Sequence, residues 1–158
     1  MKRYFVPVLM TLSLVLTACS AVSTADQTPP QVDPVSGKSD SSSNDYATLS
    51  TQQGAITVEV TPLNLDSVSD TLDFHVAMNT HSVEMSMDLA TLATLTTDTG
   101  ISVDATLWDA PRGGHHVEGT LIFPATKDGK PFLEGATKIK LTIINVDTPS
   151  RIFEWDLK

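Results

Sequence analysis

Apolar and polar residues alternate with a period of two through residues 52–158, and this alternation limits what the chain can fold into. Successive side chains of a β-strand point to opposite faces, so the period is typical of strands with one buried face. No stretch has a convincing helical period of 3.6 residues. The alternating runs are Ile56–Val60, Leu72–Met78, Val83–Leu89, Ile101–Leu107, Val117–Phe123, Ile139–Ile143 and Phe153–Leu157, with a weaker run at Ala93–Thr97.

Turn-forming residues separate these runs. Asp98 to Gly100 and Asp128 to Pro131 are tight-turn sequences, and Asp147 to Ser150 joins the last two runs at hairpin distance. Seven or eight short antiparallel strands in a segment of this length predict an all-β, two-sheet sandwich. A small barrel is the alternative.

The stretch Gly119-Thr120-Leu121-Ile122-Phe123-Pro124 follows a glycine-rich loop. It resembles a strand found late in the immunoglobulin-like domains of many secreted bacterial lipoproteins. The resemblance implies an immunoglobulin-like antiparallel β-sandwich, and most domains of that kind have no assigned activity. The cysteine pair of true immunoglobulin domains is absent, because Cys19 is the only cysteine in the chain.

The N-terminus has the organisation of an export signal. Lys2 and Arg3 precede an apolar run from Phe5 to Leu16, which is shorter than the ~20 residues that a membrane-spanning helix needs. The run ends in Leu16-Thr17-Ala18-Cys19, which resembles the bacterial lipobox. Ordinary secretory cleavage after Ala18, or an uncleaved anchor, are the alternatives.

The lipobox resemblance implies that residues 1–18 are removed and that Cys19 carries lipid, palmitate among its acyl chains. Two or three acyl chains hold a protein on a membrane, whereas one chain binds only marginally. Ser20 follows the cysteine, which implies the outer membrane where a cell has two membranes. We therefore expect an extracytoplasmic, lipid-anchored protein whose membrane partner is reached through Cys19.

Residues 19–51 are rich in Ser, Thr, Asp, Gln and Pro and poor in large apolar residues. Such a segment cannot bury enough surface to offset its ordering entropy, so we expect a lipidated cysteine on a disordered linker. Residues 52–158 suit one domain, and a chain beginning near Thr51 is expected to fold on its own. Removal of residues 1–18 takes the formal charge from -9 to -11, which disfavours nucleic acid as a partner.

Three loop histidines raise the hypothesis of a metal site, because imidazole binds zinc and copper. His81 lies in one predicted turn, and His115 and His116 close the loop that begins at Trp108. An acid such as Asp109 would be a third ligand. The two loops share an end of the sandwich if Ala93–Thr97 is irregular, and lie at opposite ends if it is a strand. No spacing matches a known zinc motif.

The same loop is the best candidate for contact with a partner. Its recognition residues are Trp108, Asp109, Arg112, His115 and His116, and aromatic and Arg side chains often dominate binding energy. The alternative is that Trp108 packs back onto the sandwich. No nucleophile elbow is present, so we expect no enzyme. The sequence predicts a non-enzymatic lipoprotein that binds a protein or envelope component, with a metal-binding lipoprotein as the alternative.

Overall fold

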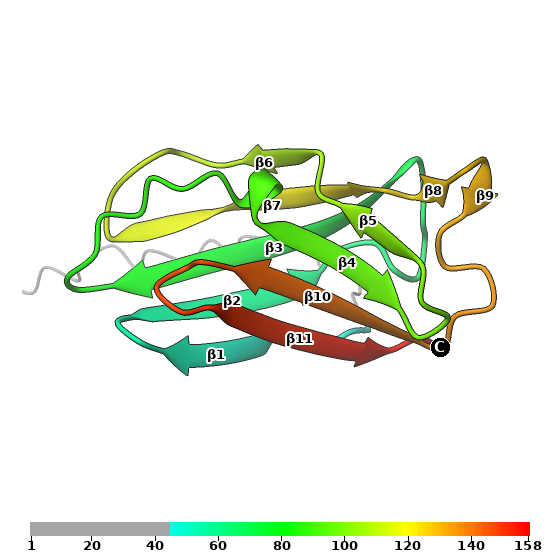
Figure 1. The fold of residues 1–158 in the computed structure, drawn as a ribbon, viewed down its shortest axis with the longest axis horizontal. Coiled ribbons are helices and arrows are strands. Elements are labelled where there is room, and N and C mark those ends of the chain that lie inside the picture. The colour runs from blue at the N-terminus through cyan, green and yellow to red at the C-terminus, as the bar shows by residue number, and fades with distance from the viewer. Residues whose placement is uncertain (1–44) are drawn as a thin grey trace, which may run out of the picture. The chain divides into compact units, whose positions relative to one another are not determined.

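The structure, a computed structural model, describes residues 45–158. They form two antiparallel sheets packed face to face, with a small hairpin beside them (Figure 1). The five-stranded sheet has the order β1 (Leu49–Gln53), β2 (Ile56–Pro62), β3 (Thr71–Thr80), β7 (His116–Pro124), β6 (Leu107–Asp109). The four-stranded sheet has the order β11 (Ser150–Asp156), β10 (Lys138–Ile144), β4 (Ala93–Thr97), β5 (Ser102–Asp104). The hairpin pairs β8 (Thr126–Lys127) with β9 (Lys130–Pro131), and a single 3-10 turn, η1, spans Leu89–Thr91.

The strand order identifies the type of sandwich. If β2, β3, β4, β5, β6, β7, β10 and β11 are lettered A, B, C, C′, D, E, F and G, the sheets become A-B-E-D and G-F-C-C′. That is the immunoglobulin arrangement. The predicted immunoglobulin-like β-sandwich is therefore confirmed, and two separate sheets replace the alternative of a closed barrel. The strand β1 is an addition at the edge of the first sheet. The predicted signal peptide, Cys19 and most of the linker lie outside the described residues.

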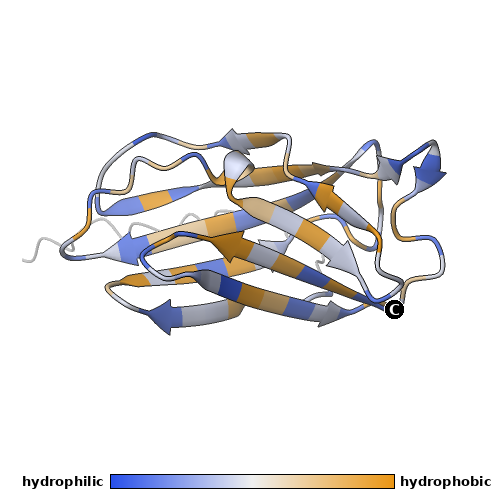
Figure 2. Cartoon of the chain, in the orientation of Figure 1, coloured by the Kyte–Doolittle hydropathy of each residue, from blue (hydrophilic) through white to orange (hydrophobic). Residues whose placement is uncertain are grey.

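The core lies between the two sheets and is built by the predicted alternation. Every second residue of β2, β3, β10 and β11 is buried, and Figure 2 shows the matching alternation of hydropathy along β3 and β10. Aromatic rings connect the layers: Phe74 meets Phe123 edge to face at a centroid distance of 5.6 Å and lies 5.7 Å from Trp155 of the other sheet. This apolar layer is what holds the loops in position.

The prediction of a strand at Val83–Leu89 is wrong. Residues 81–88 are irregular and lead into η1, whose first turn is capped by Asp88 through a bond from the Ala90 amide (3.1 Å). Met85 and Leu89 are nevertheless buried, because the irregular segment packs along the edge of the core. Alternating burial without a strand explains the false signal.

The run at Ile101–Leu107 is two strands on different sheets. The Ala105 amide bonds to Ala93 of one sheet (3.1 Å), and the next amide, that of Thr106, bonds to Ile122 of the other (2.8 Å). The chain therefore crosses between the sheets at this point, which changes the face that each later residue presents.

The fold begins earlier than the predicted boundary between residues 51 and 52. The strand β1 starts at Leu49 and pairs along its length with β2, from Leu49 opposite Val60 to Gln53 opposite Ile56. Tyr46 belongs to the buried core. The last residues of the predicted linker are thus part of the sandwich.

Gly119 sits where β6 turns away from β7. A Cβ atom at this position would overlap the carbonyl oxygen of Asp109 and the Cβ of Ala110, both of which belong to the chain leaving β6. Backbone atoms cannot move aside as a flexible side chain can. The glycine that begins the stretch ending at Pro124 is therefore required by close packing.

We expect Gly119→Ala to destabilise the protein by about 1–3 kcal/mol, since the added methyl must displace backbone. Urea unfolding measures the loss. The neighbouring Thr120→Ala, at a half-buried position on the outer face of the same strand, should cost less than about 1 kcal/mol. Equal stability of Gly119→Ala and the parent protein would contradict the close approach.

Candidate functional site: the loop end of the sandwich

Two loops meet at one end of the sandwich, which we call the loop end (residues 81–88 and 110–115). The strand register places them there: Gln53 lies opposite Ile56, and Ile56 lies opposite Thr80. The Thr80 amide then bonds to the carbonyl of His115 at 3.0 Å. The end of β3 and the start of β7 are therefore adjacent, and the two loops leave the sheet side by side.

Backbone hydrogen bonds tie the two loops together. The Met85 amide donates to the Gly114 carbonyl (3.1 Å), and the Gly113 amide donates to the Met85 carbonyl (2.9 Å). Glu84 Oε1 accepts from the Gly114 amide at 2.6 Å. Both glycines have positive φ, +88° and +106°, and a Cβ on Gly113 would lie only 2.7 Å from the Glu84 carboxylate. The glycine pair therefore lets the acidic side chain reach the loop backbone, which fixes the loop's shape.

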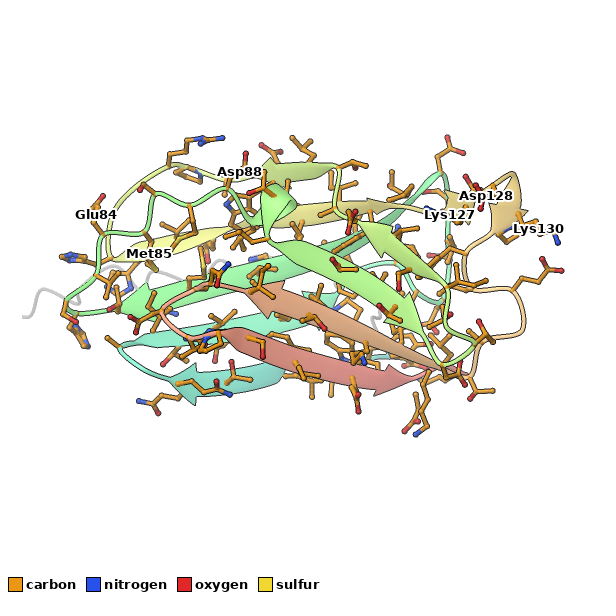
Figure 3. All side chains as sticks on the ribbon, in the orientation of Figure 1. Glu84, Met85, Asp88, Lys127, Asp128 and Lys130 are labelled. Atoms are coloured by element: carbon orange, nitrogen blue, oxygen red, sulfur yellow. The ribbon has the colours of Figure 1, made fainter. Side chains whose placement is uncertain are left out.

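Arg112 is the exposed cation of the loop end. Its guanidinium lies 2.9 Å from the carboxylate of Asp88, and the two side chains are 67% and 34% exposed. An ion pair this accessible contributes ~0–1 kcal/mol to stability. The ion pair ties Arg112 to the segment that carries Glu84, Met85 and Asp88, which Figure 3 labels, while most of the Arg112 side chain stays in contact with solvent.

Trp108 does not belong to the contact surface. It is 8% exposed and part of the core, so the alternative interpretation, in which it packs onto the sandwich, is correct. Its strand neighbours Leu107 and Asp109 point the opposite way and are exposed. The crossing between the sheets at Ala105 and Thr106 puts Trp108, rather than Leu107, on the inner face.

The predicted metal ligands are not assembled. His81 and His115 are exposed at the loop end, while His116 begins β7 with its Nδ1 atom 2.7 Å from Asn79 Oδ1. Asp109 pairs with Thr120 further along the strand. Within residues 45–158, no three His, Cys, Asp or Glu side chains are placed to hold a metal ion. The structure therefore does not bring His81, His115 or His116, and Asp109 together into one cluster.

The expectation that a strand at Ala93–Thr97 would put the two loops at opposite ends of the sandwich is wrong. Ala93–Thr97 is a strand, β4, yet the two loops share an end. That expectation also counted Val83–Leu89 as a strand. Because this segment is irregular, the chain crosses the sandwich one time fewer, and both loops leave from the same end. The residues that sequence reasoning missed, Glu84 and Asp88, act on partners 30 and 24 positions away. The glycine pair was the one local signal of that close approach.

No protein-family model matches the chain, and no curated protein matches it. Among solved structures, it is similar to the crystal structure of a DUF4426 family protein from Pseudomonas aeruginosa PAO1, at 11% sequence identity and a TM-score of 0.41. That match covers 68% of this chain and 93% of the other. The fold and the loop end define a small immunoglobulin-like domain, and that class rests on the strand order given above. In residues 45–158 no helix is long and apolar enough to cross a membrane.

Proposed function

We propose that this protein is a lipid-anchored extracytoplasmic lipoprotein whose sandwich binds a protein or another component of the cell envelope through its loop end, without catalysis. Cys19 would carry the lipid, and the residues before Asp45 would connect it to the sandwich. The exposed side chains of Arg112, His81 and His115 would make the contact.

The observation that carries this proposal is where the described chain begins. The strand β1 runs toward the loop end, because its last residue, Gln53, is opposite Ile56. Ile56 in turn is opposite Thr80, which bonds to His115 at the loop end. Asp45 therefore lies toward the opposite end, where its carboxylate is 2.8 Å from the Lys158 ammonium. Figure 1 marks the C-terminus at that end, and Figure 3 labels Glu84 at the other. A lipid tether upstream of Asp45 would enter the sandwich at the end opposite the loop end, which leaves the loop end free to contact a partner.

The loop end is also suited to binding because it is already ordered. Three hydrogen bonds to Gly113, Gly114 and Met85 fix the loop backbone, and the Asp88 ion pair restrains Arg112. A surface that is ordered before binding loses less conformational entropy when a partner docks. This supports recognition by a fixed surface.

We expect Cys19→Ala to abolish incorporation of labelled palmitate, because the modified sulfur is removed. Metabolic labelling with an alkyne analogue of palmitate, followed by gel fluorescence, measures this. Ser20→Ala, which keeps the cysteine, should label as strongly as the parent protein. Undiminished labelling of Cys19→Ala would refute the anchor.

A further inference from the structure

Three of the four edges of the two large sheets are protected against pairing with another strand. The edge strands β5 and β6 are only three residues long. The edge of β1 is covered by side chains from β11: Arg151 donates to the carbonyls of Thr51 (3.2 Å) and Gln53 (2.7 Å), and Trp155 donates to that of Ala47 (2.9 Å). Short strands and occupied carbonyls are ordinary ways to block strand addition.

The fourth edge, that of β11, is open. Bonds at both ends of the β10–β11 pair join odd-numbered residues, Leu157 to Thr137 (2.7 Å) and Asn145 to Pro149 (3.3 Å). Antiparallel pairing alternates, so the even-numbered residues turn their N–H and C=O groups away from β10. Within residues 45–158 no other segment bonds to these groups of Ile152, Glu154 or Asp156. The strand is seven residues long, contains neither proline nor lysine, and presents Ile152 at 53% exposure.

The four-stranded sheet is also one strand too narrow to cover the other sheet. The inward side chains of β2 are fully buried, whereas Leu49 and Thr51 of β1 are only half-buried and Gln53 is exposed. In Figure 1, β1 extends beyond β11 at the lower edge of the molecule. A strand added beside β11 would bury more of β1, which Arg151 and Trp155 now cover only in part.

This overhang also decides what can be added. A second copy that paired through its own β11 would place its own overhanging β1 against the β1 of the first copy. A single extended segment brings no second layer and fits. Its charge is set by the outer row of β11, where Asp156 is 80% exposed although it pairs with Lys138 at 2.6 Å. Glu154 lies opposite Lys140 in the register but forms no ion pair with a described residue, so both carboxylates can take a further cation on the open side. The chain as a whole has a formal charge of -9.

We propose that the free edge of β11 binds an extended, basic segment of a partner protein by strand addition. The main chain of Ile152 and Glu154 would pair with the segment, and basic side chains of the segment would lie opposite Glu154 and Asp156. Main-chain bonds supply affinity in such complexes, and alternate side chains supply specificity. This inference does not depend on the lipid anchor or on the loop end.

The test uses the full chain and the peptide acetyl-Lys-Val-Lys-Val-Val-Val-Thr-amide, which places lysines opposite Asp156 and Glu154 when it runs antiparallel to β11. Amide hydrogen exchange at Ile152 and Glu154 should slow by about tenfold or more at saturating peptide. Exchange at Phe153 and Trp155, already bonded to β10, should not change. Unchanged exchange at Ile152 and Glu154, or equal protection by a peptide with glutamates in place of both lysines, would overturn the proposal.

Ile152→Pro sharpens the test, because it removes an outward N–H and leaves the bonds to β10 intact. It should weaken peptide binding by about tenfold, whereas Ile152→Val should bind as the parent does. Equal peptide binding by the two variants would contradict strand addition at the edge of β11. Protection of Ile152 and Glu154 that grows with protein concentration in the absence of peptide would identify a second copy as the occupant and reject the partner segment.

Discussion

A chain that begins at Thr51 will be unfolded or close to it, whereas one that begins at Asp45 will fold. The shorter chain lacks the buried Tyr46 and the half-buried Leu49, and it leaves the indole N–H of Trp155 without the Ala47 carbonyl. Lost burial and an unpaired buried donor together cost about 5 kcal/mol. Small domains have a total stability of roughly 5–15 kcal/mol, so the loss is comparable to the whole.

Circular dichroism and thermal melting of the two chains measure this. The chain from Asp45 should show a β-type spectrum and one cooperative transition. The chain from Thr51 should lack the transition or melt far lower. If a separate peptide spanning Asp45 to Leu49 restores the transition when it is mixed with the chain from Thr51, that result would support the contacts of Tyr46, Ala47 and Leu49. Equal melting temperatures of the two chains would show that residues 45–50 are not needed for folding and would support a domain that begins at residue 52.

Arg151→Met will destabilise the sandwich by about 3–5 kcal/mol. Arg151 is fully buried, yet in residues 45–158 no carboxylate forms an ion pair with it. Its guanidinium donates to the carbonyls of Val146, Thr51 and Gln53, which join the β10–β11 turn to β1. Burial lowers the pKa of Arg151, and the nearby charge of Asp147 opposes that shift. Methionine fills similar space but leaves three carbonyls without their donor.

Thermal melting should place Arg151→Met roughly 15 °C or more below the parent protein. The matched control is Arg112→Met, which removes an exposed guanidinium with a single ion pair and should cost less than about 1 kcal/mol. If both variants melt alike, Arg151 does not join the two sheet edges.

Alternation predicted the strands whose two faces differ most in polarity. The strands β2, β3, β7, β10 and β11 each bury every second residue through most of their length, so their sequences carry the period directly. The strand β1 reads Leu-Ser-Thr-Gln-Gln and has no such contrast, because the other sheet does not cover it. Besides its hairpin with β2, its place in the fold depends on Arg151 and Trp155, about 100 residues later, and no local pattern reports those contacts.

The candidate site was predicted less well for a related reason. The crossing at Ala105 and Thr106 reverses which residues face inward, so Trp108 is buried and Leu107 is 50% exposed. Arg112, His115 and His116 do lie together at one end with His81, as expected of the loop. The contacts that shape that end come from Glu84 and Asp88, and only tertiary structure brings them there.

The most direct test of the proposed function compares the two ends of the sandwich in living cells. A photoreactive benzoylphenylalanine would replace Arg112 at the loop end in one variant and Asp66, in the exposed turn between β2 and β3 at the opposite end, in another. Both variants would keep Cys19. We predict that illumination yields a defined crosslinked envelope component from position 112 and none from position 66. Crosslinking from position 66 alone, or equally from both positions, would contradict contact with the partner through the loop end.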